Sequence, residues 1–464
     1  MHNILYTILK KKWLPVLLLT ISSATVSAQQ TDTLIRLKDA VTIGEQRYHL
    51  LQAQKYNIEA AEVKVNVVKY SRLPSLDVSY QAGVSTANNL IGTFYPTGIL
   101  PISGPPTSGN KFEPGTGSAA AVLLNWQAVT FGERNARINV AVSEAGVQKA
   151  GLQKERFQHT INIISCYLDV LLFNANLSIH QHNIERVEAN LRQSRVLANS
   201  GIKAGVDTAL FQSELSKAKI EYINASRQLE TLQWKLARLI VLDHLPLPQD
   251  SLFLFQLPSM PFPANSDFSL HPSMQYAQSQ FSLSQSKEQQ IKKSYLPKIN
   301  IWGTGFARGS GFQADGTLET WEGMKLNRYN YSAGLQLVFP LMKYGEAKRQ
   351  LQQQAFLSKA AAARLEDQRS ELSVQQQIAN TTFAHSLQVA SETNAQLKSA
   401  QTAFHAMQIR YNTGLVNFSD LIQTQYNLLK SELDLKQSYW DAWKALLLEA
   451  AVKGDVTIFL NEIR

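Results

Sequence analysis

Two very long stretches without proline constrain this chain more than any other feature. Residues 132–200 and 345–412 contain no proline, and after the opening Gly132 and Gly345 the weak helix formers are only Gly146 and Gly151. Apolar side chains recur in both stretches at steps of three and four, which is the spacing of a coiled coil. A helix of about 68 residues extends for about 100 Å, whereas the average helix has only 11–12 residues. These helices therefore cannot belong to an ordinary globular domain.

The chain also repeats itself in tandem. Three segments in the first half recur in the same order in the second half, at offsets of 223, 213 and 209 residues. They are Arg72–Leu76 with Tyr295–Ile299, Phe131–Glu133 with Tyr344–Glu346, and Ala204–Val206 with Thr413–Leu415. Five prolines gather between residues 245 and 266. We therefore divide the chain into a first repeat, 29–248, and a second repeat, 249–464.

Each repeat follows the same predicted plan. A first helix (about 37–72 and 272–295) ends at a Leu-Pro pair, because the residue before proline is disfavoured in a helix. The apolar period then changes to two, which predicts two strands around a loop. A long helical hairpin follows, with a glycine-containing turn. The predicted strands are about 74–84, 119–131, 297–308 and 328–341, and the hairpins are about 132–241 and 345–452.

The N-terminus is typical of a secretory signal peptide. Residues 1–28 contain Lys10 to Lys12, a short apolar stretch and Val26-Ser27-Ala28 as a cleavage site. A membrane anchor is the alternative, but the apolar stretch is too short to span a bilayer. No cysteine directly follows the cleavage site, so we expect no lipid attachment there. A cleaved chain would be exported from the cytoplasm to an oxidising compartment.

The composition limits the function further. Apolar residues make up 44% of the 464 residues, which excludes disorder, and only 17% are charged. The formal net charge of +9 falls to +6 without the signal, and no Lys/Arg cluster suggests a nucleic-acid partner. The single cysteine, Cys166, allows no internal disulfide. No metal, cofactor or catalytic motif is present, so we expect no enzyme and no cofactor.

The four strands pose a problem of closure. One face of each is apolar and the other carries Ser, Asn or Gln, which suits a barrel with a wet lumen. A membrane barrel tolerates no open edge and needs about eight strands, so several chains must combine. Two chains would supply eight strands and three would supply twelve; a soluble sandwich is the alternative. Four aromatic residues near the predicted strand ends suit the membrane interface: Trp126, Trp302, Tyr329 and Phe339.

These features together resemble the TolC family of outer-membrane efflux proteins, and the resemblance covers the whole mature chain. It rests on the junctions at Pro74 and Pro297, on His271-Pro272, and on the ordered series Tyr411, Gly414, Asp420-Leu421-Ile422 and Gln425. The implied fold is mainly helical. Helical hairpins of three protomers would form a trans-periplasmic α-barrel, and four strands from each would form a shared twelve-stranded outer-membrane β-barrel.

The function that the resemblance implies is that of a passive exit duct. A homotrimer in the lipid of the outer membrane of a Gram-negative bacterium, extending into the periplasm, would be recruited by a periplasmic adaptor and an inner-membrane transporter, for efflux or type I secretion. The alternative is a periplasmic adaptor or coiled-coil interaction protein, although an adaptor would have one hairpin within nested β-domains. A fibrous surface protein is disfavoured by the alternating strands.

The hairpin tips are the sites where the resemblance places closure and docking. It puts Gly205-Val206 and Gly414-Leu415 in the docking turns, where glycine would also suit a simple helix reversal. Asp207 and Asp420 follow the turns, as helix caps or as gate contacts. The sequence departs from the family at two positions: Val416 replaces an arginine and Gln423 replaces an acidic residue. An acidic ring that selects cations is therefore not expected.

Overall fold

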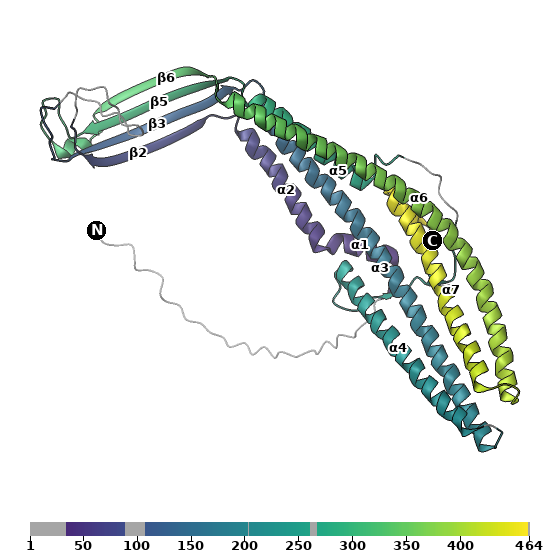
Figure 1. Ribbon diagram of the computed structural model, residues 1–464. Helices are drawn as coiled ribbons and strands as arrows, with labels where there is room; N and C mark the ends of the chain where they lie inside the picture. The colour runs from purple at the N-terminus through teal and green to yellow at the C-terminus, as the bar shows by residue number, and fades with distance from the viewer. Residues whose placement is uncertain (1–33, 89–106, 203, 260–266, 463–464) are drawn as a thin grey trace, which may run out of the picture.

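The computed structural model describes residues 34–88, 107–202, 204–259 and 267–462. The predicted signal, 1–28, lies outside them. The molecule is elongated, with a four-stranded sheet at one end and the tips of two helical hairpins at the other (Figure 1). The fold is mainly helical and is built as a tandem repeat, as the sequence predicts.

Each repeat contributes one long helical hairpin. In the first repeat α3 (Glu133–Asn199, 67 residues) is followed by α4 (Gly205–Ile240), and in the second α6 (Lys343–Asn412, 70 residues) is followed by α7 (Phe418–Lys453). The two helices of each hairpin pack along each other, and α3 also contacts α7, so the hairpins lie side by side (Figure 1).

The helix that precedes the first strand is not continuous, which corrects the expectation of one helix over 37–72. It consists of α1 (Leu37–Arg47) and α2 (His49–Tyr70), separated by Tyr48 in an extended conformation. The Tyr48 ring stacks on His159 of α3, with ring centroids 3.8 Å apart. Through this contact the chain between α1 and α2 packs against the long helix α3. The corresponding helix of the second repeat, α5 (Pro272–Ser294), is continuous.

The sheet contains one pair of strands from each repeat. The strands are β2 (Ser75–Ser85), β3 (Gly115–Val129), β5 (Lys298–Ser310) and β6 (Arg328–Val338). They are antiparallel and lie in the order β2-β3-β5-β6, so β2 and β6 are edge strands. A short 3-10 helix, η2 (Thr320–Met324), lies in the loop between β5 and β6.

The strand register gathers apolar side chains on one face of the sheet. Leu76 pairs with Leu124, and Ile301 pairs with both Trp126 and Leu335. Because directly paired residues share a face, these side chains form a band across all four strands. The opposite face carries polar residues such as Asp77, Asn300, Asn330 and Gln336. The sheet is thus amphipathic over its whole width.

A compact core lies midway along the helices, and it includes small elements that the sequence pattern does not predict. They are β1 (Leu34–Ile35), which pairs in parallel with β4 (Leu247–Pro248), the 3-10 helix η1 (Ser251–Leu254) and α8 (Thr457–Asn461). Phe253, Trp443 and Phe459 pack together and are almost fully buried. Part of the proline-rich segment between the repeats is therefore folded against the helices.

This core also explains an apolar stretch in α3. Among the described helices, α3 is the one long and apolar enough to cross a membrane, by length and composition only. Its buried apolar residues, including Ile163, Ile164 and Leu168, pack against α1, α4 and α7 in the core. We attribute the apolar stretch to this packing.

Candidate functional site at the hairpin tips

The backbone is the same at the two hairpin tips. Gly201 and Gly414 both have left-handed conformations, with φ of 73° and 79°. Ile202 N–H donates to the Leu197 carbonyl, and Leu415 N–H donates to the Arg410 carbonyl. These bonds are of the kind that ends a helix at a left-handed glycine. All equivalent atoms are 213 residues apart, the offset of the Phe131 and Tyr344 segments.

This register corrects the prediction for Gly205. Gly205 is the first residue of α4 and not the glycine of the turn, so its match to Gly414 at an offset of 209 was wrong. A Cβ atom added at Gly205 would have open space around it. The glycine that the reversal requires is Gly201, which precedes Gly414 by 213 residues, the same offset as that of the Phe131 and Tyr344 segments.

Apolar side chains are exposed at both tips. Val206, 60% exposed, and Leu415, 70% exposed, lie beside the turns together with Ile202, 62% exposed. Most of the surface of these apolar side chains is not covered by the hairpin itself. They are available for contact with another protein or another copy of the chain.

The tips are joined to each other through Tyr411 at the end of α6. Its hydroxyl donates a hydrogen bond to Oδ2 of Asp207 in the first turn of α4, over 3.1 Å. The ring is 1% exposed and packs edge-on against Phe211, which in turn packs against Phe418. This hydrogen bond and the aromatic cluster thus hold the two hairpins together at their ends.

Burial also sets the protonation state of this contact. Burial, together with the negative charge of Asp207, raises the pKa of Tyr411 from its ordinary value of 10 to about 12. The phenol therefore remains a hydrogen-bond donor throughout the physiological pH range. Asp207 also lies in the first turn of α4, where a carboxylate interacts favourably with the positive end of the helix.

The second tip lacks an equivalent contact. Asp420 lies in the first turn of α7, where Asn417 caps the helix by accepting the N–H of Asp420. Within the described residues the Asp420 carboxylate has no side-chain partner, and it is exposed. Gln423 is exposed as well and donates to Asn427 one turn later, over 3.2 Å. The side chains of Asp420 and Gln423 are thus exposed to solvent, whereas Asp207 accepts a hydrogen bond from Tyr411.

Buried polar side chains join the hairpins above the tips. Gln425 of α7 donates to Asn183 of α3 and accepts from Asn190 of α3, over 3.1 and 2.9 Å. Arg186 donates two parallel hydrogen bonds to Glu432, at 2.8 and 2.7 Å. Such paired bonds depend on geometry, so they fix the register of α3 against α7.

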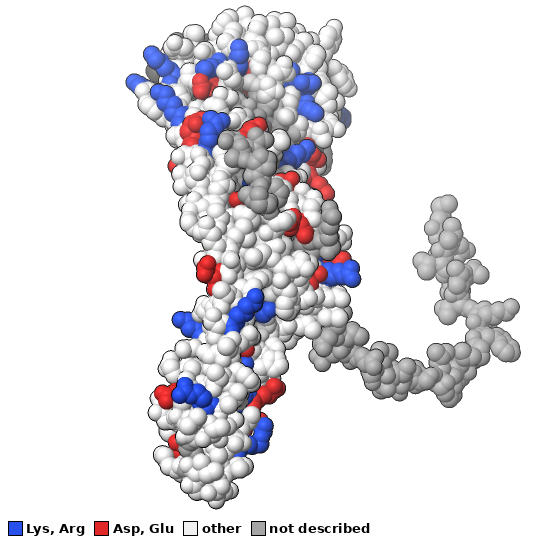
Figure 2. Space-filling view, turned by 90° about the vertical axis from the view of Figure 1, so that its right-hand side faces the viewer, with Lys and Arg blue, Asp and Glu red and all other residues white. Residues whose placement is uncertain are grey.

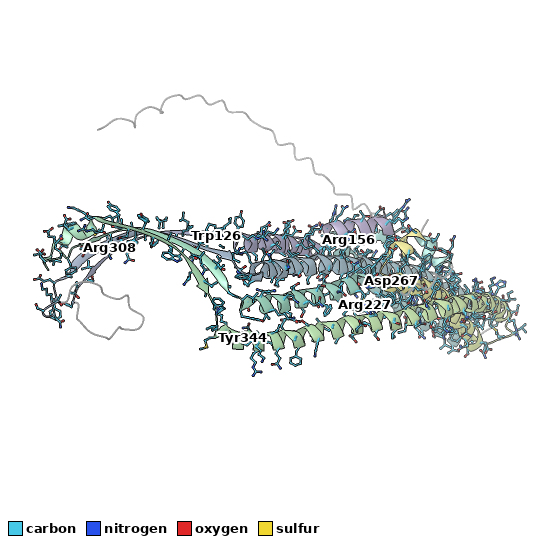
Figure 3. The ribbon with its side chains drawn as sticks, turned by 90° about the horizontal axis from the view of Figure 1, so that it is seen from above. Trp126, Arg156, Arg227, Asp267, Arg308 and Tyr344 are labelled. Atoms are coloured by element: carbon cyan, nitrogen blue, oxygen red, sulfur yellow. The ribbon has the colours of Figure 1, made fainter. Side chains whose placement is uncertain are left out.

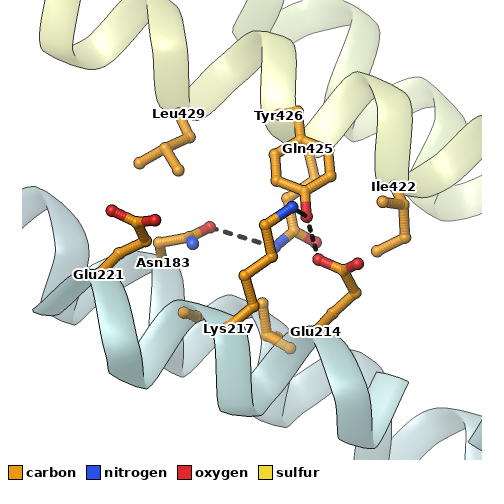
Figure 4. Close-up of a pocket in the computed structure, with 10 residues that line it drawn as sticks. Asn183, Glu214, Lys217, Glu221, Ile422, Gln425, Tyr426 and Leu429 are labelled. Carbon is orange, nitrogen blue, oxygen red and sulfur yellow. Dashed lines mark hydrogen bonds between the residues drawn. The ribbon is translucent and has the colours of Figure 1, made fainter. Parts of the chain in front are cut away.

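A small cleft opens between α4 and α7 at the same level (Figure 4). Tyr426 of α7 reaches across it, accepts a hydrogen bond from Lys217 over 2.7 Å and donates one to Glu214. The Tyr426 contact raises the pKa of Lys217, and burial raises the pKa of Tyr426. The cleft is therefore bridged by a tyrosine between two opposite charges.

The predicted interfacial aromatics divide between the two faces of the sheet. Trp126 lies on the apolar face near the helices, where its Nε1–H donates to the Arg72 carbonyl over 2.8 Å (Figure 3). Tyr329 lies on the same face at the far end, and Phe339 directly follows β6 and is 56% exposed. Together they border the apolar band at both of its ends.

Trp302 does not belong to this group, which corrects the prediction. It pairs with Asn125 and Gly334, so it shares the polar face with Asn300 and Thr304. Its ring covers Gly334 so closely that an added Cβ atom would lie 2.8 Å from it. The glycine is required for this approach, and Trp302 faces the side opposite the apolar band.

Pro74 and Pro297 lie at the helix-to-strand junctions. Pro74 separates the last turn of α2 from β2, and Pro297 separates α5 from β5. Each lacks an N–H and disfavours a helical conformation at the preceding leucine, so the helix ends there and the strand begins.

No group of three or more His, Cys, Asp or Glu side chains in the described part of the chain is placed to hold a metal ion.

Comparison with known proteins identifies the architecture. The family model for outer membrane efflux proteins matches residues 44–240 and 269–448, one stretch in each repeat. Among curated proteins, none matches the sequence.

Solved structures of outer-membrane channels share the fold. CusC has a TM-score of 0.76 at 12% identity, covering 91% of this chain and 93% of CusC. VceC of Vibrio cholerae has a TM-score of 0.72 at 13% sequence identity, and the match covers 90% of this chain and 96% of VceC. The open state of the MtrE channel of Neisseria gonorrhoeae has a TM-score of 0.68 at 17% identity, and the match covers 90% of each chain.

Proposed function

Because the chain belongs to the outer membrane efflux protein family, we propose that it forms the trimeric exit duct of a tripartite efflux or type I secretion system. In this proposal three copies close a twelve-stranded barrel in the outer membrane, and their hairpins form a tube through the periplasm. Substrates pass passively from an inner-membrane pump and a periplasmic adaptor to the outside.

The amphipathic open sheet is the observation that carries this proposal. An edge strand in hydrocarbon leaves backbone groups unpaired, so β2 and β6 need strands from other copies. Strands of 11 residues extend about 36 Å, and at the tilt of a membrane barrel they span about 25 Å. The apolar band suits lipid and the polar face suits an aqueous lumen.

The tips support the proposed periplasmic roles. The exposed apolar residues Val206 and Leu415, with Gly205 and Gly414 beside them, form the proposed docking surface for the adaptor. Asp207, held by Tyr411, and the exposed Asp420 and Gln423 form the proposed gate region. An adaptor function is disfavoured, because both repeats match a channel family and both hairpins continue one sheet.

Membrane extraction tests the duct. We expect the chain to stay in the outer-membrane fraction through high-salt and carbonate washing, to need detergent for release, and to conduct ions in planar bilayers as a crosslinkable trimer. Release by salt alone would contradict the proposal, because a closed barrel in lipid cannot be washed off.

Crosslinking from the tip tests the docking surface. Ser419→Cys places a thiol on the exposed first turn of α7, while the native Cys166 is buried, which raises its pKa to about 11 and makes it unreactive. We expect capture of a periplasmic adaptor from Ser419→Cys and none from Ser373→Cys, an exposed position midway along α6. Equal capture from both positions would refute docking at the tips.

A further inference from the structure

Basic residues gather where the helices meet the sheet. The eleven residues on the helical side of each strand are 64–74, 130–140, 287–297 and 339–349. Together these boundary segments contain eleven Lys or Arg, three Glu and no Asp. The whole sequence contains 45 basic and 36 acidic residues, so the remainder holds 34 against 33, or 31 against 33 without the three lysines of the predicted signal. The net positive charge of the mature chain therefore lies at this boundary.

Most of these cations lack an acidic partner. Three of them form ion pairs, at 2.6 to 2.8 Å: Lys64 with Glu144, Arg137 with Glu133, and Lys292 with Glu288. Within the described residues the other eight pair with no carboxylate. We call these eight the basic belt: Lys69, Arg72, Arg134, Lys287, Lys293, Lys343, Lys348 and Arg349. All four helix-to-strand junctions contribute to it.

The basic belt lies next to exposed apolar side chains on the sheet side. Leu73 is 60% exposed and Phe131 50%, while Leu341 and Met342 reach 80% and 95%. From the sheet toward the helices, the apolar band is thus followed by these exposed apolar residues and then by cations without a carboxylate partner in the adjacent helical turns. Lys and Arg in such positions keep their stems on apolar surface and their charges in the headgroup region.

The opposite end of the sheet differs. The described residues 107–114 and 308–328 contain four basic and four acidic residues: Lys111, Arg308, Lys325 and Arg328 with Glu113, Asp315, Glu319 and Glu322. That rim is electrically balanced. In Figure 2, Lys and Arg gather toward the upper end of the molecule, which carries the sheet together with its junctions to the helices. The two edges of the sheet therefore suit surfaces of different charge.

We propose that the basic belt binds the anionic headgroups of phospholipids in the leaflet that faces the helices. This inference rests on the proposed insertion of the sheet into the outer membrane. The phosphate groups of phosphatidylglycerol or cardiolipin carry the complementary charge, and each cation near an anionic surface contributes about a fivefold gain in affinity. The belt fixes the depth of the barrel on its periplasmic side.

Lipid titration of the detergent-solubilised full chain, followed by native mass spectrometry, tests this binding. We expect dioleoylphosphatidylglycerol to bind about tenfold or more tightly than dioleoylphosphatidylcholine. The triple variant Lys343→Gln, Lys348→Gln, Arg349→Gln should lower the phosphatidylglycerol affinity about tenfold and leave that for phosphatidylcholine unchanged. The matched control is Lys359→Gln, Arg364→Gln, Lys398→Gln, which removes three exposed cations from the same helix and should keep the preference.

Equal affinities of the unmodified chain for the two lipids would refute lipid binding by the basic belt. A triple variant that behaves like its control would refute it as well. Inorganic phosphate that abolishes the preference at millimolar concentration would assign the belt to a soluble anion and overturn lipid binding. A chain that resists salt washing yet shows equal affinities overturns this inference alone. A chain that salt removes from vesicles contradicts the proposed duct itself.

Discussion

The two hairpin tips have the same backbone and different side chains. Each helix ends at a left-handed glycine, Gly201 or Gly414, with the same hydrogen bonds. The residue three positions earlier is Ala198 in the first tip and Tyr411 in the second, and only Tyr411 reaches the neighbouring tip. The repeat therefore determines the shape of the tip, while single side chains determine how one tip holds another.

The difference has a consequence for the proposed trimer. Six tips would alternate around its periplasmic end, and each would meet one neighbour within its own chain and one from another chain. The contact within the chain has the Tyr411–Asp207 hydrogen bond. The contact between chains would bring Ala198 toward Asp420. Ala198 has no side-chain hydrogen-bond donor, so it cannot replace the hydroxyl of Tyr411. We therefore expect the tips to separate between chains more readily than within a chain.

Removing the Tyr411 side chain should have the largest effect, because it makes the second tip like the first. Tyr411→Ala leaves a cavity where the ring was 1% exposed, and it should destabilise the tip by about 3–5 kcal/mol. Hydrogen exchange at the ends of α6 and α7 measures this local stability, and bilayer conductance should rise. Tyr344→Ala, an exposed tyrosine of the same helix, is the control and should leave tip exchange unchanged. Unaltered exchange in Tyr411→Ala would refute the role of this ring.

Alanine at the turn glycines tests the shared backbone. Gly201→Ala and Gly414→Ala force a Cβ atom into a left-handed conformation, and each should destabilise its tip by about 1–2 kcal/mol. Gly205→Ala is the matched control, since Gly205 is helical and has open space around it. It should leave the stability unchanged or raise it by up to about 1 kcal/mol. A loss at Gly205 as large as that at Gly201 would restore the earlier assignment of the turn. Urea melting of the tip, followed by hydrogen exchange, separates these outcomes.

Much of the fold could be predicted because its patterns are long. Proline-free stretches of about 68 residues and strands with a period of two leave few alternatives. Register also places two residues that residue type alone misplaces. Gly201 precedes Gly414 by the 213 residues that separate Phe131 from Tyr344, and Trp302 has the strand parity of the polar Asn300 and Thr304.

Other features could not be predicted from local pattern. Tyr411 and Asp207 are 204 residues apart in the chain, and the Leu37 N–H finds Asp250 across 213 residues. The strands β1 and β4 have two residues each, too short for any periodicity to appear. Contacts of this kind depend on how the hairpins pack against each other. A short segment of the sequence carries no information about that packing.

Removing only the hydroxyl of Tyr411 should have a smaller effect. Tyr411→Phe keeps the aromatic cluster but loses the hydrogen bond to Asp207, at a cost of about 1 kcal/mol. It should also change the pH dependence. Since folding raises the pKa of Tyr411 from 10 to about 12, its stabilisation is complete below pH 10 and is lost as the pH rises through about 12. Hydrogen exchange of the phenylalanine variant should lack this alkaline loss; an equal loss in both proteins would assign the transition to another group.

Neutralising the tip carboxylates should have the smallest effect and bears most directly on the difference between the tips. Asp420→Asn removes an exposed charge from the first turn of α7 and should destabilise that tip by about 0.3 kcal/mol, an effect that high salt suppresses. Asp207→Asn should cost more, because it also weakens the acceptor for the buried Tyr411 hydroxyl. Bilayer conductance and hydrogen exchange at the tips, measured for both variants at low and high salt, show which substitution has the larger effect. An Asp420→Asn effect that equals the Asp207→Asn effect and persists in high salt would mean that Asp420 has a buried partner on another chain. The contacts within and between chains would then be equally strong, and the tips would open together.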